Sequence, residues 1–261
     1  MKIYISKTND KINAKRLDQE LLTDHICLNP NYKSVTLKRD VNVLMDSGAF
    51  QDRTTRVSFQ EALDRQLALE KKVGVISERI VAYDLIGDPT VTHQANIFLN
   101  SKRDELEPRQ LVFMIQGNDF GECKECFDNL YPMLKWCDCV GIGGVALSGT
   151  RTAIREKLVQ TFEYIAPMIA YIGASDIHVF GVGSIKVLDA LCAINAKYGD
   201  CIDVSCDTSS AEIRSVMGYV FSCEDRKFVK TYTKAQKMTE YHPCDVTRMN
   251  ISNLVYTIGE M

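Results

Sequence analysis

The chain has 261 residues, of which 46% are hydrophobic and 25% are charged. This length allows one large domain or two small ones, and the composition is ordinary for a soluble globular protein. The formal net charge of −3 excludes a global attraction to nucleic acid or to a membrane, so a polyanion would need a local basic patch.

The sequence has no pattern typical of a membrane or secreted protein. No apolar run approaches the ~20 residues that cross a bilayer. The N-terminal stretch lacks the apolar core and cleavage site of a signal peptide. We therefore expect a cytoplasmic protein with no membrane partner.

Short β-rich runs alternate with helical patterns along the chain. The predicted strands cover residues 2–6, 41–48, 79–84, 111–117, 139–144, 177–184 and 201–207, and 227–233 is a candidate eighth strand. The helical patterns cover 58–74, 120–136, 152–169 and 185–199, and Ser58 with Glu61 predicts a capping box for the first of them.

This alternation predicts an α/β protein with parallel strands and right-handed crossovers, and the near-continuous apolar strands predict burial on both faces. Eight strands in a chain close to the ~250 residues typical of the fold predict a (β/α)8 TIM-like barrel. We expect a single domain over 1–261, with 222–261 as a C-terminal extension. A doubly wound open sheet is the alternative.

Ten cysteines in a reducing compartment indicate free thiols or a metal site rather than disulfides. Cys123, Cys126, Cys137 and Cys139 have CxxC and CxC spacings that resemble those of zinc ligands. The run between the pairs reads as an amphipathic helix, and no turn glycine accompanies either pair. Core and surface thiols are therefore the favoured interpretation, and we expect no cofactor, with zinc as the alternative.

Polar residues and glycines occupy the predicted C-terminal strand ends, where a barrel carries its chemistry. They are Asp46, Asp84, Gln116, Gly143 with Gly144, Gly181 with Gly183, and Asp207. A turn or a helix cap explains any one of them. Three carboxylates and one primary amide from separate strands together predict a binding or catalytic site.

Carboxylate and amide side chains suit a heterocycle with an amide-like edge, such as guanine. Gly143 and Gly144 would let backbone amides approach a ring carbonyl, and Phe50 and Phe180 would cover the two faces of the ring. A pocket of this kind recognises a purine or deazapurine by hydrogen bonds to its edge and by stacking on its faces.

Several carboxylates near a ribose C1′ resemble the glycosidase arrangement of a nucleophile and a general acid/base. Asp203 and Asp207 share one face of their predicted strand. Asp207 is nearer the C-terminal end and can reach a substrate there, whereas Asp203 would lie deeper and be structural.

Six segments resemble, in order, motifs of the tRNA-guanine transglycosylase superfamily. They are VLMDSGAFQ (43–51), AYD (82–84), FMIQG (113–117), GIGGVALSG (141–149), HVFGVGS (178–184) and IDVSCD (202–207). The first resembles the DSGG[YF]Q segment of the family. The resemblance implies a (β/α)8 barrel that exchanges a guanine in a polynucleotide for a 7-deazaguanine base.

The same resemblance implies residue roles. Asp207 would attack C1′ and form a covalent intermediate, and Asp46 would be the general acid/base. The residues that would bind the base are Asp84 and Gln116 at its edge, Ser47, Gly143 and Gly144 beside it, and Phe50 and Phe180 on its faces.

Three departures from the tRNA enzymes point to a compact branch of the superfamily. Aligned without a gap on "ID", the family's nucleophile falls on Cys206, but CDTSS (206–210) resembles the DNA-acting branch, which favours Asp207. The tail has only His242 and Cys244 where the tRNA enzymes carry a zinc site, so the zinc subdomain is reduced or absent. There is also no room for an RNA-binding domain. Together these resemble the 7-deazaguanine DNA transglycosylases of phages and genomic islands.

A basic run, RKFVKTYTKAQK (226–237), contains no acidic residue. Its Arg226, Lys227, Lys230 and Lys234 would contact nucleic-acid phosphates, and a solvated surface is the alternative. The expected partners are DNA or tRNA, a 7-deazaguanine base such as 7-cyano-7-deazaguanine (preQ0), and a homodimer partner or an accessory protein.

Other functions stay open at this point. The enzyme could act on tRNA. Alternatively, FGVGS (180–184) could be a phosphate-binding loop of an enzyme for a free phosphorylated metabolite. A binding subunit that keeps the fold without turnover is the third alternative.

Overall fold

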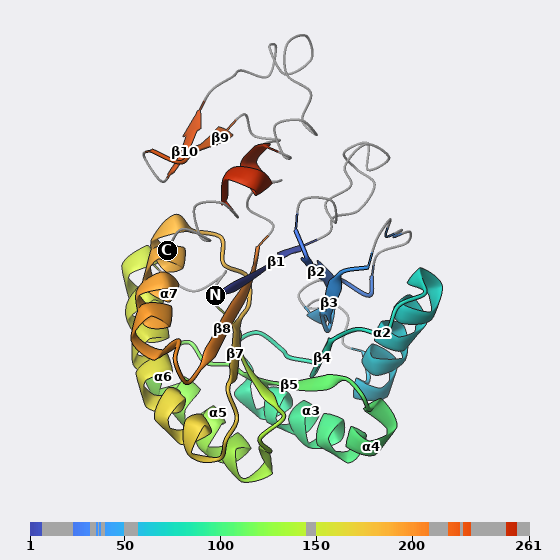
Figure 1. Ribbon diagram of the computed structural model, residues 1–261. Helices are drawn as coiled ribbons and strands as arrows, with labels where there is room; N and C mark the ends of the chain where they lie inside the picture. Colours follow the sequence, from blue (N-terminus) through green and yellow to red (C-terminus); the bar gives the residue numbers. More distant parts are fainter. Residues whose placement is uncertain are drawn as a thin grey trace.

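In the computed structural model, eight parallel strands close into a barrel. The structure describes residues 1–6, 23–31, 35, 37, 40–49, 57–144, 150–208, 219–224, 227–230 and 249–254. The barrel strands are β1 (Lys2–Ser6), β2 (His25–Leu28), β3 (Asn42–Met45), β4 (Arg79–Val81), β5 (Gln110–Ile115), β6 (Cys139–Ile142), β7 (Asp176–Val179) and β8 (Asp203–Thr208). Each pairs in parallel with the next, and β8 pairs with β1. The predicted (β/α)8 TIM-like barrel is confirmed (Figure 1).

The eighth barrel strand is β2, and the prediction that 227–233 supplies it is wrong. Residues Lys227–Lys230 form β10, which pairs antiparallel with β9 (Tyr219–Ser222) in a separate two-stranded sheet. The segment KFVK alternates polar and apolar residues, a pattern typical of an antiparallel strand with one face in solvent. The segment ICL in β2 is continuously apolar and buried, as the wall of a parallel barrel requires.

The described helices lie on the outer side of the barrel wall (Figure 1). They are α2 (Phe59–Val73), α3 (Pro89–Ser101), α4 (Arg103–Leu106), α5 (Phe120–Leu130) with the 3-10 turn η4 (Tyr131–Met133), α6 (Arg151–Tyr171) and α7 (Ile185–Tyr198). The Ser58 hydroxyl caps α2 by accepting from the Glu61 amide at 3.1 Å. The Glu61 carboxylate pairs with Arg65 instead of returning to the cap, so the capping box is one-sided.

Buried amide side chains join two of the helices to the barrel wall. Asn96 of α3 donates to the Met114 carbonyl at 2.8 Å and accepts from the Met114 amide at 2.9 Å. Gln66 of α2 donates to the Val81 carbonyl at 2.9 Å and to the Asp46 carbonyl at 3.0 Å. These bonds fix the backbone where β3 and β4 end, which is where the candidate site begins.

The Asn96 contact should contribute measurably to stability. We expect Asn96→Ala to lower the free energy of unfolding by about 2–3 kcal/mol, because it leaves two buried backbone groups of β5 without partners. Urea unfolding followed by circular dichroism measures this loss. Gln94→Ala, at an exposed position of the same helix, is the control and should change stability by less than about 0.5 kcal/mol. Equal effects in the two variants would contradict the assignment.

The described pieces after β8, which are β9, β10 and residues 249–254, lie beyond the end of the barrel at which β8 ends (Figure 1). Residues 249–254 are helical, and Asn250 accepts from the Phe221 amide at 2.6 Å and donates to the Tyr219 carbonyl at 3.0 Å. The side chains of Phe221, Ile251 and Leu254 belong to the same hydrophobic core as the barrel strands.

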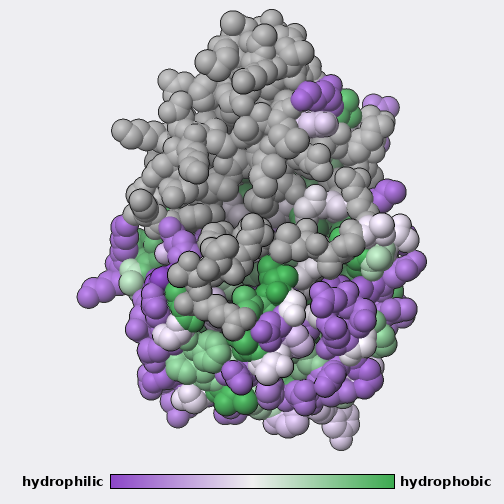
Figure 2. All heavy atoms as spheres, turned by 180° about the vertical axis from the view of Figure 1, so that it is seen from behind, coloured by the Kyte–Doolittle hydropathy of each residue, from purple (hydrophilic) through white to green (hydrophobic). Residues whose placement is uncertain are grey.

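The described part of the face seen in Figure 2 is largely polar. Figure 2 shows hydrophilic side chains over the outer helices, with smaller hydrophobic areas between them. Among the residues that the structure describes, none of the helices combines the length and the apolar character that crossing a bilayer would need.

Candidate active site at the strand ends

Five strands bring the predicted polar residues to one end of the barrel. Asp46 directly follows β3, Gln116 directly follows β5 and Asp207 lies at the end of β8. Gly143 directly follows β6, and Asp84 comes shortly after β4, separated from it by Ala82 and Tyr83. Because all barrel strands are parallel, these ends share one mouth.

Asp84 is the centre of a hydrogen-bonded row. The Ser47 hydroxyl donates to its Oδ1 at 3.0 Å, and the Gln116 amide nitrogen donates to its Oδ2. Burial raises the pKa of Asp84, and these two donors partly offset that rise. Gln116 is buried, and its Oε1 has no hydrogen-bond partner among the described residues. The row therefore holds one buried acceptor oxygen, Gln116 Oε1, that no described residue uses.

Asp46 is held in a fixed orientation beside this row. Its Oδ2 accepts from Asn29 Nδ2 at 2.9 Å and its Oδ1 from the Ser47 amide at 2.9 Å. Burial raises the pKa of Asp46 to about 7, and the negative charges of Asp84 and Asp207 add to the rise. A carboxyl group with this pKa is present in both protonation states near neutral pH, as a general acid/base must be.

Asp207 faces the inside of the barrel at the end of β8. Its Oδ1 accepts from the Gly181 amide at 2.8 Å and lies 3.6 Å from His178 Nε2. Its Oδ2 accepts from the Ser6 hydroxyl at 3.3 Å, a long hydrogen bond. Asp207 is 9% exposed, so the carboxylate is largely desolvated but reachable from the mouth.

The neighbouring acidic and thiol groups of β8 lie elsewhere. Cys206 is fully buried on the other face of the strand, and burial together with the Asp207 charge raises the pKa of its thiol. Asp203 is exposed at the opposite end of β8, so the expectation that it lies deeper in the barrel is wrong. Of these residues, Asp207 alone is placed to reach a substrate.

Gly143 has a different role from the one expected. Its amide donates to the Ile115 carbonyl at 3.0 Å and so is already used within the barrel wall. A Cβ atom at this position would lie 2.0 Å from Gln116 Nε2. Gly143 is therefore needed for the close approach of the Gln116 side chain. Gly144 has a positive φ of 71° beside the same amide, a conformation that favours glycine.

Of the two aromatic residues predicted to cover the faces of a base, Phe180 is among the described residues and Phe50 is not. Phe180 is partly buried, and its ring packs against His178 with centroids 4.4 Å apart. A Cβ atom at Gly141 would lie 2.9 Å from the Phe180 ring, so this glycine makes room for the ring. Phe50 lies outside the described residues, so its predicted place on the other face of a base stays a prediction.

The backbone amides of FGVGS (180–184) bind Asp207 and do not form an empty phosphate-binding loop. The Gly181 amide binds the Asp207 carboxylate, and the Val182 amide donates to the Asp207 carbonyl at 3.0 Å. A carboxylate already occupies the place where a phosphate oxygen would bind, and its charge repels a second anion. This arrangement disfavours the phosphate-binding interpretation.

The basic run is described only in part. Lys230 is exposed on β10, and its ammonium group lies 4.9 Å from the centre of the Tyr219 ring. Arg226, Lys234 and the side chain of Lys227 lie outside the described residues, as do His242 and Cys244. The predicted phosphate contacts therefore stay predictions.

The four cysteines with zinc-like spacing do not gather. Cys123, Cys126 and Cys139 are buried, whereas Cys137 is exposed. The sulfur of Cys123 faces the Gly117 carbonyl and that of Cys139 faces the Val140 carbonyl. In the part of the chain that the structure describes, no three His, Cys, Asp or Glu side chains are grouped as a metal ion would require.

Sequence reasoning missed three contacts of the site. Asn29 orients Asp46, and its signal was the apolar run ICL followed by Asn and Pro, a strand end like those recognised elsewhere. Ser6 ends the predicted strand 2–6, so its position at a strand end is the signal for its contact with Asp207. His178 precedes Phe180 by two residues, so strand alternation places both on the inner face.

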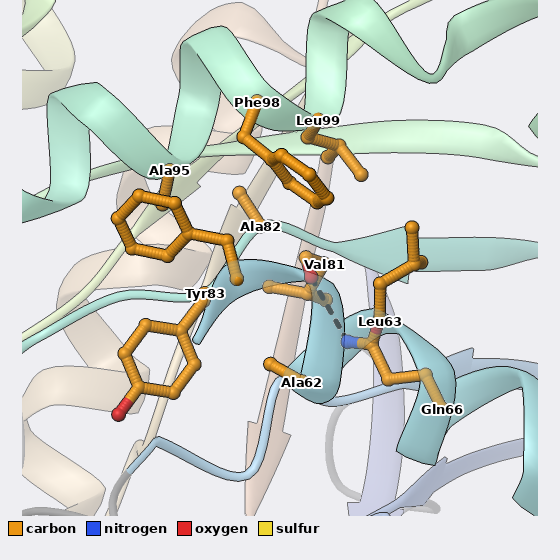
Figure 3. A pocket seen from close by; sticks show the side chains of 10 residues that line it. Ala62, Leu63, Gln66, Val81, Ala82, Tyr83, Ala95, Phe98 and Leu99 are labelled. Atoms are coloured by element: carbon orange, nitrogen blue, oxygen red, sulfur yellow. Dashed lines mark hydrogen bonds between the residues drawn. The ribbon is translucent and has the colours of Figure 1, made fainter. Parts of the chain in front are cut away.

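A small cavity lies on the outer side of the barrel wall, between α2, β4 and α3 (Figure 3). Ala62 and Leu63 line it from α2, Val81 from β4, and Ala95 and Phe98 from α3. Its volume of about 10 Å³ is close to that of one water molecule, so it cannot hold a nucleobase. The strand ends remain the candidate active site.

No protein-family model matches the sequence, and no curated protein matches it either.

Proposed function

We propose that the protein is a glycosyltransferase that replaces guanine in a polynucleotide by a 7-deazaguanine base of the preQ0 type, with DNA as the preferred substrate. The observation that carries the proposal is the placement of two carboxylates, Asp46 and Asp207, beside the Asp84–Gln116 row at one end of the barrel. Carboxylates in two different environments suit a nucleophile and a general acid/base.

The Asp84–Gln116 row suits the edge of guanine. Guanine presents a ring N–H and an exocyclic amino group side by side, which are two adjacent donors. Asp84 Oδ1 and Oδ2 keep lone pairs beyond those that Ser47 and Gln116 use, and Gln116 Oε1 is an acceptor without a partner among the described residues. Adenine lacks this pair of donors, so the row would select against it.

The proposed reaction has two steps through one covalent intermediate. Asp207 attacks C1′, the bond from C1′ to N9 of guanine breaks, and guanine leaves with the electron pair and a proton from Asp46. The incoming 7-deazaguanine then gives its N9 proton to Asp46 and attacks C1′, which releases Asp207. The half-titrated state of Asp46 near pH 7 supports this use as acid and then base.

The choice of DNA rests on the resemblance of CDTSS (206–210) to the compact DNA-acting branch. Exchange on tRNA is the second candidate. The direct test supplies labelled guanine and preQ0 with tRNA and with duplex and single-stranded DNA. Label entering DNA supports the proposal, label entering tRNA supports the second candidate, and label entering neither contradicts both.

A substitution at Gly143 tests the base-binding row. Gly143→Ala should weaken the binding of free preQ0 by about tenfold or more, because the added methyl group must displace the Gln116 amide and break a buried hydrogen bond to Asp84. Isothermal titration calorimetry gives the Kd. Gly121→Ala, at an exposed position of α5, is the control. Unchanged binding in both variants would remove Gln116 from the base site.

A further inference from the structure

A column of polar side chains runs through the inside of the barrel and ends at Asp207. We call it the interior column, and it consists of Asp176, Arg79, Ser205, His178 and Asp207. Arg79 is 1% exposed and His178 is 0% exposed. Buried polar groups of this kind are costly unless they are paired, so their contacts indicate which atoms carry hydrogens.

The direction of the hydrogen bonds in the lower half of the interior column starts from Arg79. The Arg79 guanidinium only donates, and it donates to Asp176 and, at 2.8 Å, to the Ser205 oxygen. The single Ser205 proton then has two acceptors within reach. His178 Nδ1 lies 2.9 Å away and the Ile177 carbonyl lies 3.3 Å away. Donation to His178 Nδ1 puts the ring proton on Nε2, where it faces the Asp207 carboxylate, whereas the other tautomer would set the Nε2 lone pair against that carboxylate.

This direction sets the state of the His178 ring. When Nδ1 accepts from Ser205, the proton of a neutral imidazole must be on Nε2. Burial lowers the pKa of His178, and the nearby Arg79 charge lowers it further, whereas Asp207 opposes the change. The ring is therefore neutral at physiological pH. Its Nε2 has no hydrogen-bond partner at standard distance among the described residues, and the nearest acceptor is Asp207 Oδ1 at 3.6 Å.

Aromatic neighbours hold the ring in this orientation. The Tyr4 ring lies edge-on at 5.5 Å between centroids, and the Phe180 ring lies at 4.4 Å on the side of the mouth. The titratable and charged groups around His178 are thus Asp207 from β8, Arg79 from β4 and Tyr4 from β1. Of the three, Asp207 is the one with an acceptor oxygen facing His178 Nε2, at 3.6 Å.

We propose that His178 is a positioning residue, which aims its Nε2–H at Asp207 Oδ1 and thereby makes Oδ2 the atom that attacks C1′. The identity of C1′ as the attacked atom rests on the proposed function. The hydrogen bond from His178 to Asp207 Oδ1 does not. The Gly181 amide and His178 both act on Oδ1. Among the described residues Oδ2 receives only the long bond from Ser6, so it keeps a lone pair for C1′.

His178 would neither give nor take a proton in the reaction. As the bond from Oδ2 to C1′ forms and the bond from C1′ to N9 breaks, the negative charge of Asp207 passes to the leaving guanine, which Asp46 protonates. A neutral donor on Oδ1 fixes the carboxylate without neutralising it. A charged imidazolium at this place would stabilise the carboxylate and make it a weaker nucleophile.

The first arm of the test does not depend on activity. The full chain is labelled with 15N-histidine, and the His178 signal is assigned with His178→Phe. At pH 7.5 we expect a neutral ring with the proton on Nε2. We also expect Ser205→Ala to produce a mixture of tautomers, because it removes the donor to Nδ1. An imidazolium, or a proton on Nδ1, would overturn the inference.

The second arm separates positioning from binding. His178→Phe should slow covalent adduct formation about 10²-fold and leave the Kd for free preQ0 within about twofold. His178→Gln, which can donate from its amide, should recover about tenfold of the loss. A folded His178→Phe with the wild-type rate would overturn the inference. If the wild-type protein forms no adduct with DNA or tRNA, the proposed function fails, and the NMR arm still decides the hydrogen bond. If His178→Phe does not fold, His178→Gln assigns the signal.

Discussion

Asp207→Asn should abolish base exchange, with a loss of about 10⁴-fold or more, because the amide oxygen is too weak a nucleophile to form the bond to C1′. The amide oxygen can still accept from the Gly181 amide, so the carboxylate is replaced without removing the contact that holds this strand end. The rate of label incorporation into DNA measures the loss, and thermal unfolding shows whether the fold is kept.

Asp203→Asn is the matched control for this variant. Asp203 belongs to the same strand and carries the same charge, but it is exposed at the opposite end of the barrel. It should retain the wild-type rate within about twofold. Equal losses in the two variants would mean that β8 is disturbed as a whole, and full activity of Asp207→Asn would remove Asp207 from the chemistry.

Asp46→Asn should slow exchange by about 10²–10⁴-fold, because general acid/base catalysis contributes on that order. It should also change the pH dependence. If departure of guanine limits the wild-type rate, that rate should fall as the pH rises above about 7, because the carboxyl group then loses the proton that guanine needs. The residual activity of Asp46→Asn should lack this decline, since its amide does not titrate. A wild-type profile unchanged in shape by the substitution would contradict the assignment.

The same substitution should stabilise the protein at alkaline pH. The pKa of Asp46 is raised from 3.8 to about 7, so the folded chain binds a proton that the unfolded chain has released. Stability from this group therefore falls as the pH rises from about 4 to about 7, by at most about 4 kcal/mol. Asp46→Asn should remove that fall and unfold at a higher temperature than wild type at pH 8. Measurement of Tm between pH 5 and 8 tests this, and a lower Tm at pH 8 would contradict the burial argument.

The barrel was predictable because its strands carry a strong local signal. A run such as LVFMI, continuously apolar and followed by Gln and Gly, indicates a buried parallel strand without any tertiary information. The four residues of β2 were too short a signal, and the longer KFVKTYT run competed for the same place. Barrel closure decides between them, since β2 pairs with both β1 and β3, whereas β10 pairs with β9 in a separate sheet.

The site was predictable as a set of strand ends but not as a network. The sequence places Asp46, Asp84 and Gln116 at the mouth, because residue order along a parallel strand fixes which end each occupies. It does not show that the Gly143 amide is used within the wall, or that Asn29 and His178 orient the carboxylates. These contacts depend on barrel closure, which brings β2 beside β3 and β7 beside β8.

The most direct test of the account is mass spectrometry of the protein incubated with guanine-containing DNA, denatured before the intermediate can turn over. Peptide mapping should find a nucleic-acid adduct on Asp207, absent in Asp207→Asn and released when preQ0 is added before denaturation. A protein that exchanges bases while its adduct maps to another residue, or one that forms no adduct with any polynucleotide, would contradict the proposed mechanism.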